Sequence, residues 1–168
     1  DKKIQLVARQ SFGSWVFYNT FTSLGGTVGK VSYYTFFQYK TGNGWRPNSD
    51  FNTYNYYGNV NYKISKKTTI GLDITLMSYL AHQPGGLSDQ MFEEDPRQSN
   101  RERNWFQVNW NMAAFHLNHK FNASNEFDFR LFGLYANRYS IGFRPNRVAT
   151  IDNGTTERDL IKGNFRNI

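Results

Sequence analysis

The sequence predicts an all-β fold in which about seven long antiparallel strands form a segment of a transmembrane β-barrel. Apolar and polar residues alternate through much of the chain, most clearly over 54–64 and 70–76, and a period of two is typical of strands. Aromatic residues make up 18% of the 168 residues, and aromatic residues favour strands. Short and long connections between the strands also alternate along the chain, which is typical of outer-membrane barrels.

The first three strands are expected near the N-terminus, joined by tight turns. A strand at about 3–11 places Ile4 and Leu6 on one face. A strand at about 15–24 is rich in aromatic and hydroxyl residues, although its alternation is blurred. A third strand, at about 30–40, alternates aromatic residues with lysine, serine and glutamine. Short segments containing glycine separate the three strands, as expected for tight antiparallel turns.

The fourth and fifth strands, at about 54–64 and 69–80, show the clearest alternation. In the fourth strand, tyrosines and Val60 alternate with asparagines. In the fifth strand, Leu72 and its apolar neighbours alternate with polar residues such as Asp73. One face of this hairpin is therefore apolar and aromatic, and the other carries amide and charged groups.

The sixth and seventh strands are expected at about 105–121 and 126–143. In the sixth strand the apolar residues change from even to odd positions near Ala113 and Ala114, which we interpret as a β-bulge. The seventh strand alternates aromatic residues with charged ones. Two long loops on the same rim complete the pattern, at about 81–104 and 144–168.

The aromatic face is expected to contact lipid, and the amide and charged face to line a wet interior. The longest apolar runs contain four residues, for example 15–18, so a membrane-spanning helix is not expected. A strand of about 11 residues, at roughly 3.4 Å per residue and tilted by about 45°, rises roughly 26 Å, close to the apolar band of outer-membrane barrels. The alternative is a soluble β-sandwich that buries its aromatic residues.

Seven strands do not close such a barrel, because the two edges would leave backbone groups unpaired in hydrocarbon. The segment after residue 143 is polar and shows no closing strand. We therefore expect the chain to be one part of a larger barrel.

Three segments carry a resemblance to a known family. They are QSFGSWVFYNTFTSLGG at 10–26, PGGLSDQMFEEDPRQSNRERNWF at 84–106 and NASNEFDFRLFGLYANR at 122–138. They resemble TonB-dependent outer-membrane receptors, most closely the branch that includes ferric dicitrate receptors. The resemblance implies roughly the first third of a barrel of about 22 strands, without its plug domain.

The resemblance implies uptake of an anionic ferric chelate, such as a siderophore or ferric citrate, across the bacterial outer membrane. The implied partners are the chelate, TonB through the missing plug domain, and outer-membrane lipid with lipopolysaccharide. No cofactor and no enzymatic activity are expected. The alternatives are a passive anion-selective porin and a soluble all-β module that binds carbohydrate or another ligand.

Basic residues are the candidate ligand-binding groups. The chain has a formal net charge of +7, which favours an anionic partner, and guanidinium groups bind carboxylates in pairs of hydrogen bonds. The same arginines could instead be solvated or bind lipopolysaccharide phosphates at the rim. The candidates are Arg138, Arg144, Arg147, Arg97, Arg101 and Arg103.

Four aromatic residues near strand ends are candidates for the membrane interface, where such rings concentrate. They are Trp45, Tyr79, Trp105 and Tyr139. Stacking on a ligand is the alternative role for these rings.

Other motifs predict no chemistry. His116 and His119 lie three residues apart, which on a strand places them on opposite faces, so no metal site is expected. The acidic run at 93–95 is expected to be solvated beside nearby arginines. The glycine-rich segment at 25–30 lacks the spacing and following helix of a phosphate loop. No nucleic-acid recognition element accompanies the positive charge, so no nucleic-acid partner is expected.

Overall fold

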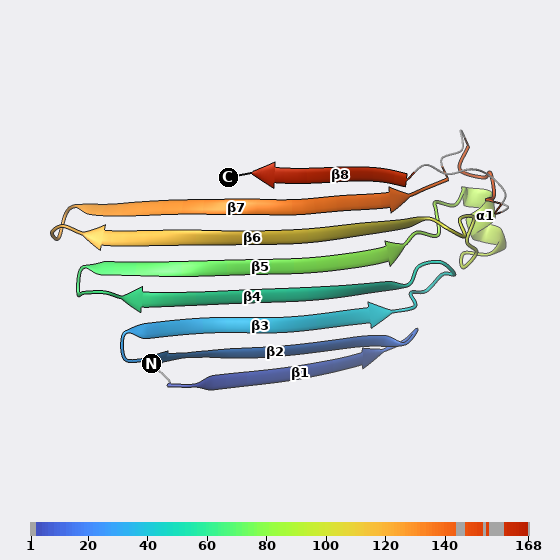
Figure 1. The fold of residues 1–168 in the computed structure, drawn as a ribbon. Helices are drawn as coiled ribbons and strands as arrows, with labels where there is room; N and C mark the ends of the chain where they lie inside the picture. The colour runs from blue at the N-terminus through green and yellow to red at the C-terminus, as the bar shows by residue number, and fades with distance from the viewer. Residues whose placement is uncertain (1–2, 144–146, 153, 155–159, 168) are drawn as a thin grey trace.

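The computed structural model describes residues 3–143, 147–152, 154 and 160–167 (Figure 1). The chain forms one antiparallel sheet whose eight strands follow in sequence order, so the all-β prediction is confirmed. A short helix lies between the fifth and sixth strands. The elements are β1 (Gln5–Gly13), β2 (Phe17–Val28), β3 (Val31–Gly42), β4 (Phe51–Lys63), β5 (Thr68–His82), α1 (Asp89–Glu94), β6 (Trp105–Lys120), β7 (Glu126–Ile141) and β8 (Leu160–Asn167).

The eighth strand corrects the prediction of seven. β8 lies in the segment expected to be a polar loop, and it pairs with β7 from Leu160 opposite Ile141 to Asn167 opposite Leu134. One of its faces is mostly polar and includes Lys162, so the sequence lacks the apolar alternation that identifies a strand. Backbone hydrogen bonds to β7 support β8 without that pattern.

The predicted β-bulge in the sixth strand is wrong. β6 pairs residue by residue with both neighbours, and Ala113 lies opposite Ile74 on β5 and Gly133 on β7. The change from even to odd apolar positions is therefore a real exchange of polarity between the two faces of β6. Asn111 and Phe115 lie on the same face of β6, on either side of Ala113. That face is therefore polar toward the long loops, at Asn111, and apolar toward the tight turns, at Phe115.

The long connection between β5 and β6 contains one turn and a half of helix. The Ser88 hydroxyl accepts a hydrogen bond from the Met91 backbone N–H at 3.3 Å, which caps the first turn of α1. The Met91 side chain is buried. The long loop expected at about 81–104 is thus a packed unit that contains a short helix.

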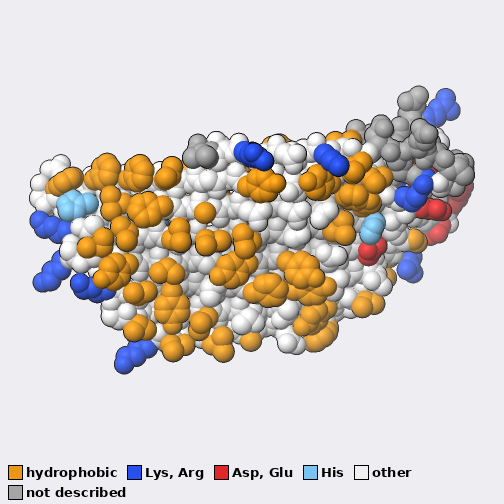
Figure 2. Space-filling model, viewed as in Figure 1, with side chains coloured by type: hydrophobic (Ala, Val, Ile, Leu, Met, Phe, Trp, Pro, Cys, Tyr) orange, Lys and Arg blue, Asp and Glu red, His pale blue; other side chains and the backbone are white. Residues whose placement is uncertain are grey.

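The sheet has no second layer among the described residues. Their buried hydrophobic side chains are only Ala81, Met91 and Ala136. We call the two faces the apolar face, which carries Leu72 and its in-register neighbours, and the polar face, which carries Asp73. The large side chains of the apolar face are exposed (Figure 2); they include Tyr54, Tyr62, Leu72 and Phe129.

On the apolar face, a band of apolar residues runs from the turn ends of β6 and β7 toward the loop end of β1 and β2, and a separate apolar cluster lies near the loop end of β6 and β7 (Figure 2). On β1 and β2 the band reaches the loop end, where Phe12 pairs with Tyr18. On β6 it ends at Ala113, because Asn111 follows toward the loops. The hydrogen-bonded row that contains Ala113 crosses the sheet and reaches Leu6 on β1. The band on β1 extends to Phe12, so its edge shifts by six residues between β6 and β1.

The inclination of the band follows from standard strand geometry. A shift of six residues at about 3.4 Å, over five strand spacings of about 4.8 Å, gives an angle of about 40° between the band edge and the hydrogen-bonded rows. The turn ends of the hairpins shift in the same sense, since the β6–β7 turn lies beyond the β2–β3 turn in Figure 1. Some apolar residues of this face lie on the loop side of the edge: Leu80 on β5, Trp105 on β6, and Tyr135, Tyr139 and Ile141 on β7.

Candidate functional site

The candidate site lies at the loop end of the sheet, where the connections after β3, β5 and β7 meet (Figure 1). Asn48 of the first connection donates from Nδ2 to the Gln83 and Arg101 carbonyls of the second, at 3.0 and 2.8 Å. The Asp152 N–H of the third connection donates to the Asn100 carbonyl at 3.0 Å. These contacts hold the three connections together as one body.

Arg46 is the main link between the first two connections. Its Nε donates to the Gln98 carbonyl at 2.8 Å, and its Nη1 donates to the Gly85 carbonyl at 2.8 Å. Most of the guanidinium donors are therefore occupied by main-chain acceptors. Arg46 therefore contributes a positive charge to the loop region, and its hydrogen bonds hold the two connections together.

Arg101, a predicted ligand-binding residue, is buried and serves the same purpose. Its Nη1 donates to the Asn100 and Thr150 carbonyls at 2.7 and 2.6 Å, and its guanidinium lies 5.2 Å from the Phe143 ring centroid. Its side chain has no open path to a ligand, since only 6% of the residue is exposed. The structure thus assigns Arg101 to loop packing.

Asn100 and Asp152 form the buried centre of the loop body. Asn100 Nδ2 donates to the Gly86 carbonyl at 2.6 Å and to the Val148 carbonyl at 2.8 Å. Arg103, another predicted ligand-binding residue, places Nη2 3.6 Å from the Asp152 carboxylate. Because the Asp152 side chain is fully buried, Arg103 supplies a counter-charge that a buried carboxylate requires.

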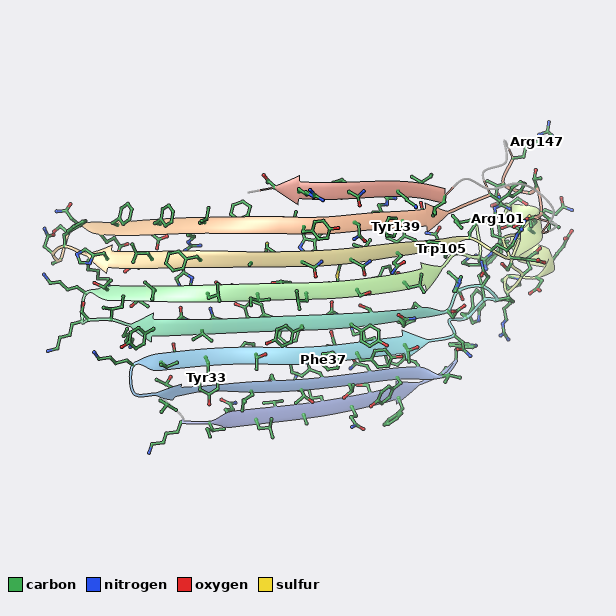
Figure 3. All side chains as sticks on the ribbon, viewed as in Figure 1. Tyr33, Phe37, Arg101, Trp105, Tyr139 and Arg147 are labelled. Atoms are coloured by element: carbon green, nitrogen blue, oxygen red, sulfur yellow. The ribbon has the colours of Figure 1, made fainter. Side chains whose placement is uncertain are left out.

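The remaining predicted arginines lie apart from one another. Arg97 donates from Nε to the Trp45 carbonyl at 3.3 Å. Arg138 lies on the polar face of β7, with its guanidinium 4.7 Å from the Phe106 ring centroid. Arg147 is exposed and projects from the loop end (Figure 3), and Arg144 lies outside the described residues. The five described candidates therefore divide between the loop body, the polar face of β7 and the exposed side of the loops.

The four predicted interface aromatics also separate. Trp105 and Tyr139 lie on the apolar face near the loop end, where Trp105 pairs with Ile141 (Figure 3). Tyr79 is on the polar face of β5, because it lies next to Leu80 in sequence and strand neighbours point to opposite faces. It therefore does not share a face with Trp105 and Tyr139. Trp45 belongs to the connection between β3 and β4, outside the strands.

A hydrogen-bonded network occupies the polar face at mid-sheet. Asp73 accepts from the Tyr57 hydroxyl at 2.6 Å and from Asn59 Nδ2 at 2.8 Å. His116 lies with Nδ1 3.3 Å from the Asp73 carboxylate and Nε2 2.7 Å from Asn61 Oδ1. All these groups have partners within the network, which makes it a structural element of the polar face.

No metal centre is found among the described residues, which contain no group of three or more His, Cys, Asp or Glu side chains placed to hold an ion. His116 lies on the polar face and His119 on the apolar face, since their partners on β5 are Gly71 and Thr68. The predicted separation of the two histidines is confirmed. His119 Nδ1 instead lies 2.9 Å from the Thr68 hydroxyl.

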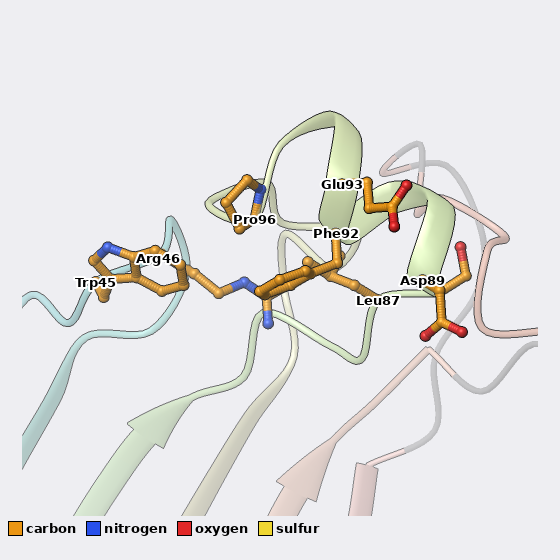
Figure 4. A pocket seen from close by; sticks show the side chains of 8 residues that line it. Trp45, Arg46, Leu87, Asp89, Phe92, Glu93 and Pro96 are labelled. Carbon is orange, nitrogen blue, oxygen red and sulfur yellow. The ribbon is translucent and has the colours of Figure 1, made fainter.

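A pocket of about 460 Å³ opens between the first two connections (Figure 4). Trp45 and Arg46 line it from the β3–β4 connection, and the segment around α1 supplies the other walls. Trp45 and Phe92 are 41% and 56% exposed, so both rings are available to a ligand. The remaining lining residues are Leu87, Ser88, Asp89, Glu93 and Pro96.

Reasoning from sequence missed the loop body and the pocket. The buried Asn100 and Asp152 belong to segments without periodicity, and no local signal marks a polar side chain as buried. The position of Trp45 near a strand end predicts a membrane anchor and gives no indication of a pocket. Trp45 and Phe92 line one pocket because of contacts between connections that are far apart in sequence.

The sequence matches no protein-family model and no curated protein. Among the described residues, no helix has the length and apolar character needed to cross a membrane.

Proposed function

We propose that the chain forms part of the wall and outer loops of a TonB-dependent transporter in the bacterial outer membrane. In this proposal the sheet belongs to an antiparallel transmembrane β-barrel with more than eight strands, about 22 in the family that it resembles. The transporter takes up an anionic ferric chelate without covalent chemistry. Its partners are the chelate, TonB, and outer-membrane lipid with lipopolysaccharide.

The observation that carries the proposal is the oblique apolar band. Strands of outer-membrane barrels tilt by about 35–45° from the barrel axis. A flat slab of hydrocarbon therefore cuts such strands along a line inclined to the hydrogen-bonded rows, and the angle of about 40° in this sheet falls within that range. A soluble sandwich would need a second sheet to cover this face, and the described residues form only one sheet.

The exposed rings and the sheet edges support the same proposal. An eight-stranded sheet with Leu72, Phe129 and similar residues exposed on one face needs a cover, because contiguous apolar surface of this extent is unfavourable in water. Hydrocarbon provides that cover without a second layer. β1 and β8 each have one edge without a partner strand among the described elements, and barrel closure would pair both edges.

The ligand class rests on charge and position. The chain has a net charge of +7, and Arg138 extends from the polar face while Arg147 and Arg97 lie on the exposed side of the loops. These three arginines are the proposed contacts for the carboxylates of a ferric chelate. We leave Arg101 out of these contacts because it is buried in the loop body, and Arg103 because its guanidinium faces the Asp152 carboxylate.

Two measurements test the proposal. The full protein should partition with outer membranes and change its gel mobility on heating in detergent. It should also bind ferric citrate, seen as quenching of tryptophan fluorescence, with weaker binding in R138Q and unchanged binding in R130Q. A monodisperse protein in plain buffer would instead favour the soluble module, and anion conductance without saturable binding would favour the porin.

A further inference from the structure

We propose that the pocket between Trp45 and α1 binds a neutral oligosaccharide. It is a binding site distinct from the arginines proposed to contact the chelate, and it does not depend on the membrane proposal. Trp45 and Arg46 form one side of the pocket, and Phe92, Asp89 and Glu93 form the other (Figure 4).

The two sides of the pocket are fixed before any ligand binds. Arg46 is held by the Gln98 and Gly85 carbonyls, both at 2.8 Å, and the Trp45 carbonyl accepts from Arg97 Nε at 3.3 Å. On the other side, the buried Met91 anchors α1 beneath the exposed Phe92. A ligand that enters this pocket therefore meets a site that is already ordered, which lowers the entropic cost of binding.

The lining chemistry fits sugar rings. The exposed faces of Trp45 and Phe92 offer flat apolar surfaces on which the C–H face of a pyranose can stack. Asp89 and Glu93 are four residues apart on α1, so both carboxylates lie on the same side of the helix and can accept hydrogen bonds from hydroxyl groups. Each sugar hydroxyl both donates and accepts, which suits a pocket that combines carboxylates with a guanidinium.

The charges around the pocket disfavour other ligand classes. An anion would meet Asp89 and Glu93, neither of which forms an ion pair among the described residues. A cation would meet the Arg46 guanidinium in the wall and Arg97 beside Trp45. A neutral polyhydroxylated ligand avoids both repulsions and uses every kind of group in the lining.

The test is titration of the purified protein, in detergent where required, with maltohexaose, cellohexaose and chitohexaose, followed by tryptophan fluorescence and equilibrium dialysis. We expect at least one of these sugars to bind saturably, with little dependence on salt. W45A and F92A should each weaken that binding by about tenfold or more. W15A is the matched control, since Trp15 is also an exposed loop tryptophan, at 47% against 41% for Trp45, and it should bind normally.

Three outcomes would overturn the proposal. The first is the absence of saturable binding to all three sugars by either method. The second is binding that W45A and F92A leave unchanged, which would place the sugar elsewhere. The third is preferential, salt-sensitive binding of spermidine or ferric citrate at the same residues, which would assign the pocket to a charged ligand. None of these outcomes bears on whether the sheet lies in a membrane.

Discussion

Two residues in one hydrogen-bonded row should lie at different depths in a bilayer. Phe37 on β3 connects to Asn111 on β6 through Tyr56 and Leu76, each pairing in register with the next. All four side chains are on the apolar face. If the strands tilt as the apolar band indicates, the row is inclined to the membrane plane, and Asn111 lies nearer the outer surface than Phe37.

The expected difference in depth follows from the sheet. The two residues are three strands apart, which is about 14 Å along the row. At an inclination of about 40°, this separation corresponds to about 9 Å along the membrane normal. Phe37 then lies well inside the hydrocarbon, and Asn111 lies near its outer boundary.

Nitroxide labelling measures this depth directly. The chain contains no cysteine, so F37C and N111C each give a single labelling site without further changes. The labelled proteins, reconstituted in phosphatidylcholine vesicles, are compared by their accessibility to oxygen and to a water-soluble nickel chelate. The matched control is T75C, whose residue lies on the polar face beside Leu76, and its label should be accessible to the nickel chelate.

Equal depths for the F37C and N111C labels would refute the inclined band, and a deeper label at N111C would reverse it. Labels at both sites that are fully accessible to the nickel chelate would place the apolar face in water. In that case the membrane proposal fails, and the apolar face needs a protein partner.

Three further substitutions test separate features of the structure. L72R should destabilise the membrane-inserted protein by about 2–4 kcal/mol, against about 0–1 kcal/mol for N111R beyond the band edge; urea unfolding in vesicles measures the difference, and equal costs would contradict the band. N100A should loosen the loop body, because loss of one partner of a buried hydrogen bond costs about 1–3 kcal/mol; faster cleavage by trypsin within the outer connections is the readout, and an unchanged digestion pattern would argue against the role of Asn100. G71A should displace the His116 ring, because a Cβ at this position would overlap it; a changed imidazole NMR signal is expected, and an unchanged signal would show that the ring lies elsewhere.

The strands were predictable from sequence where alternation extends over the whole element. β3, β4 and β5 show this clearly, since tyrosines or aliphatic residues occupy every second position against asparagine, lysine or aspartate. β8 was not predictable, because Lys162 and Arg166 share a face with Leu160 and no simple pattern results. Where a strand crosses the edge of the proposed membrane band, one of its faces changes from apolar to polar. Prediction from a two-residue alternation of apolar and polar residues does not detect such a strand.

The candidate site was less predictable than the fold. The sequence pointed to arginines in the long connections, but it did not distinguish Arg101, which is buried, from Arg147, which is exposed. That distinction depends on which carbonyl groups a second connection brings close. The Thr150 carbonyl, for example, accepts from Arg101 at a sequence separation of 49, and such contacts have no local signal.

The exchange of polarity along β6 indicates why this strand keeps its register. A bulge at Ala113 would have kept Phe106, Trp110 and Phe115 on one face, but it would have interrupted the ladders to β5 and β7. In hydrocarbon, each backbone group left without a partner costs several kcal/mol. With the register kept, the ladders stay complete, and Asn109 and Asn111 emerge on the apolar face on the loop side of the band.

The asparagines are tolerated there because both have hydrogen-bond partners, and Asn111 donates from Nδ2 to the Tyr135 carbonyl at 3.4 Å. Asn109 accepts from the Ser78 hydroxyl at 2.9 Å and donates from Nδ2 to Asn137 Oδ1 at 2.8 Å. This row of polar groups runs across β5, β6 and β7 just beyond the apolar residues, at a level where a bilayer gives way to headgroups and water in the proposed orientation. The row lies between the apolar band and the rings of Trp105 and Tyr139 near the loop end, which is the arrangement expected for strands that extend past the hydrocarbon into an aromatic interface.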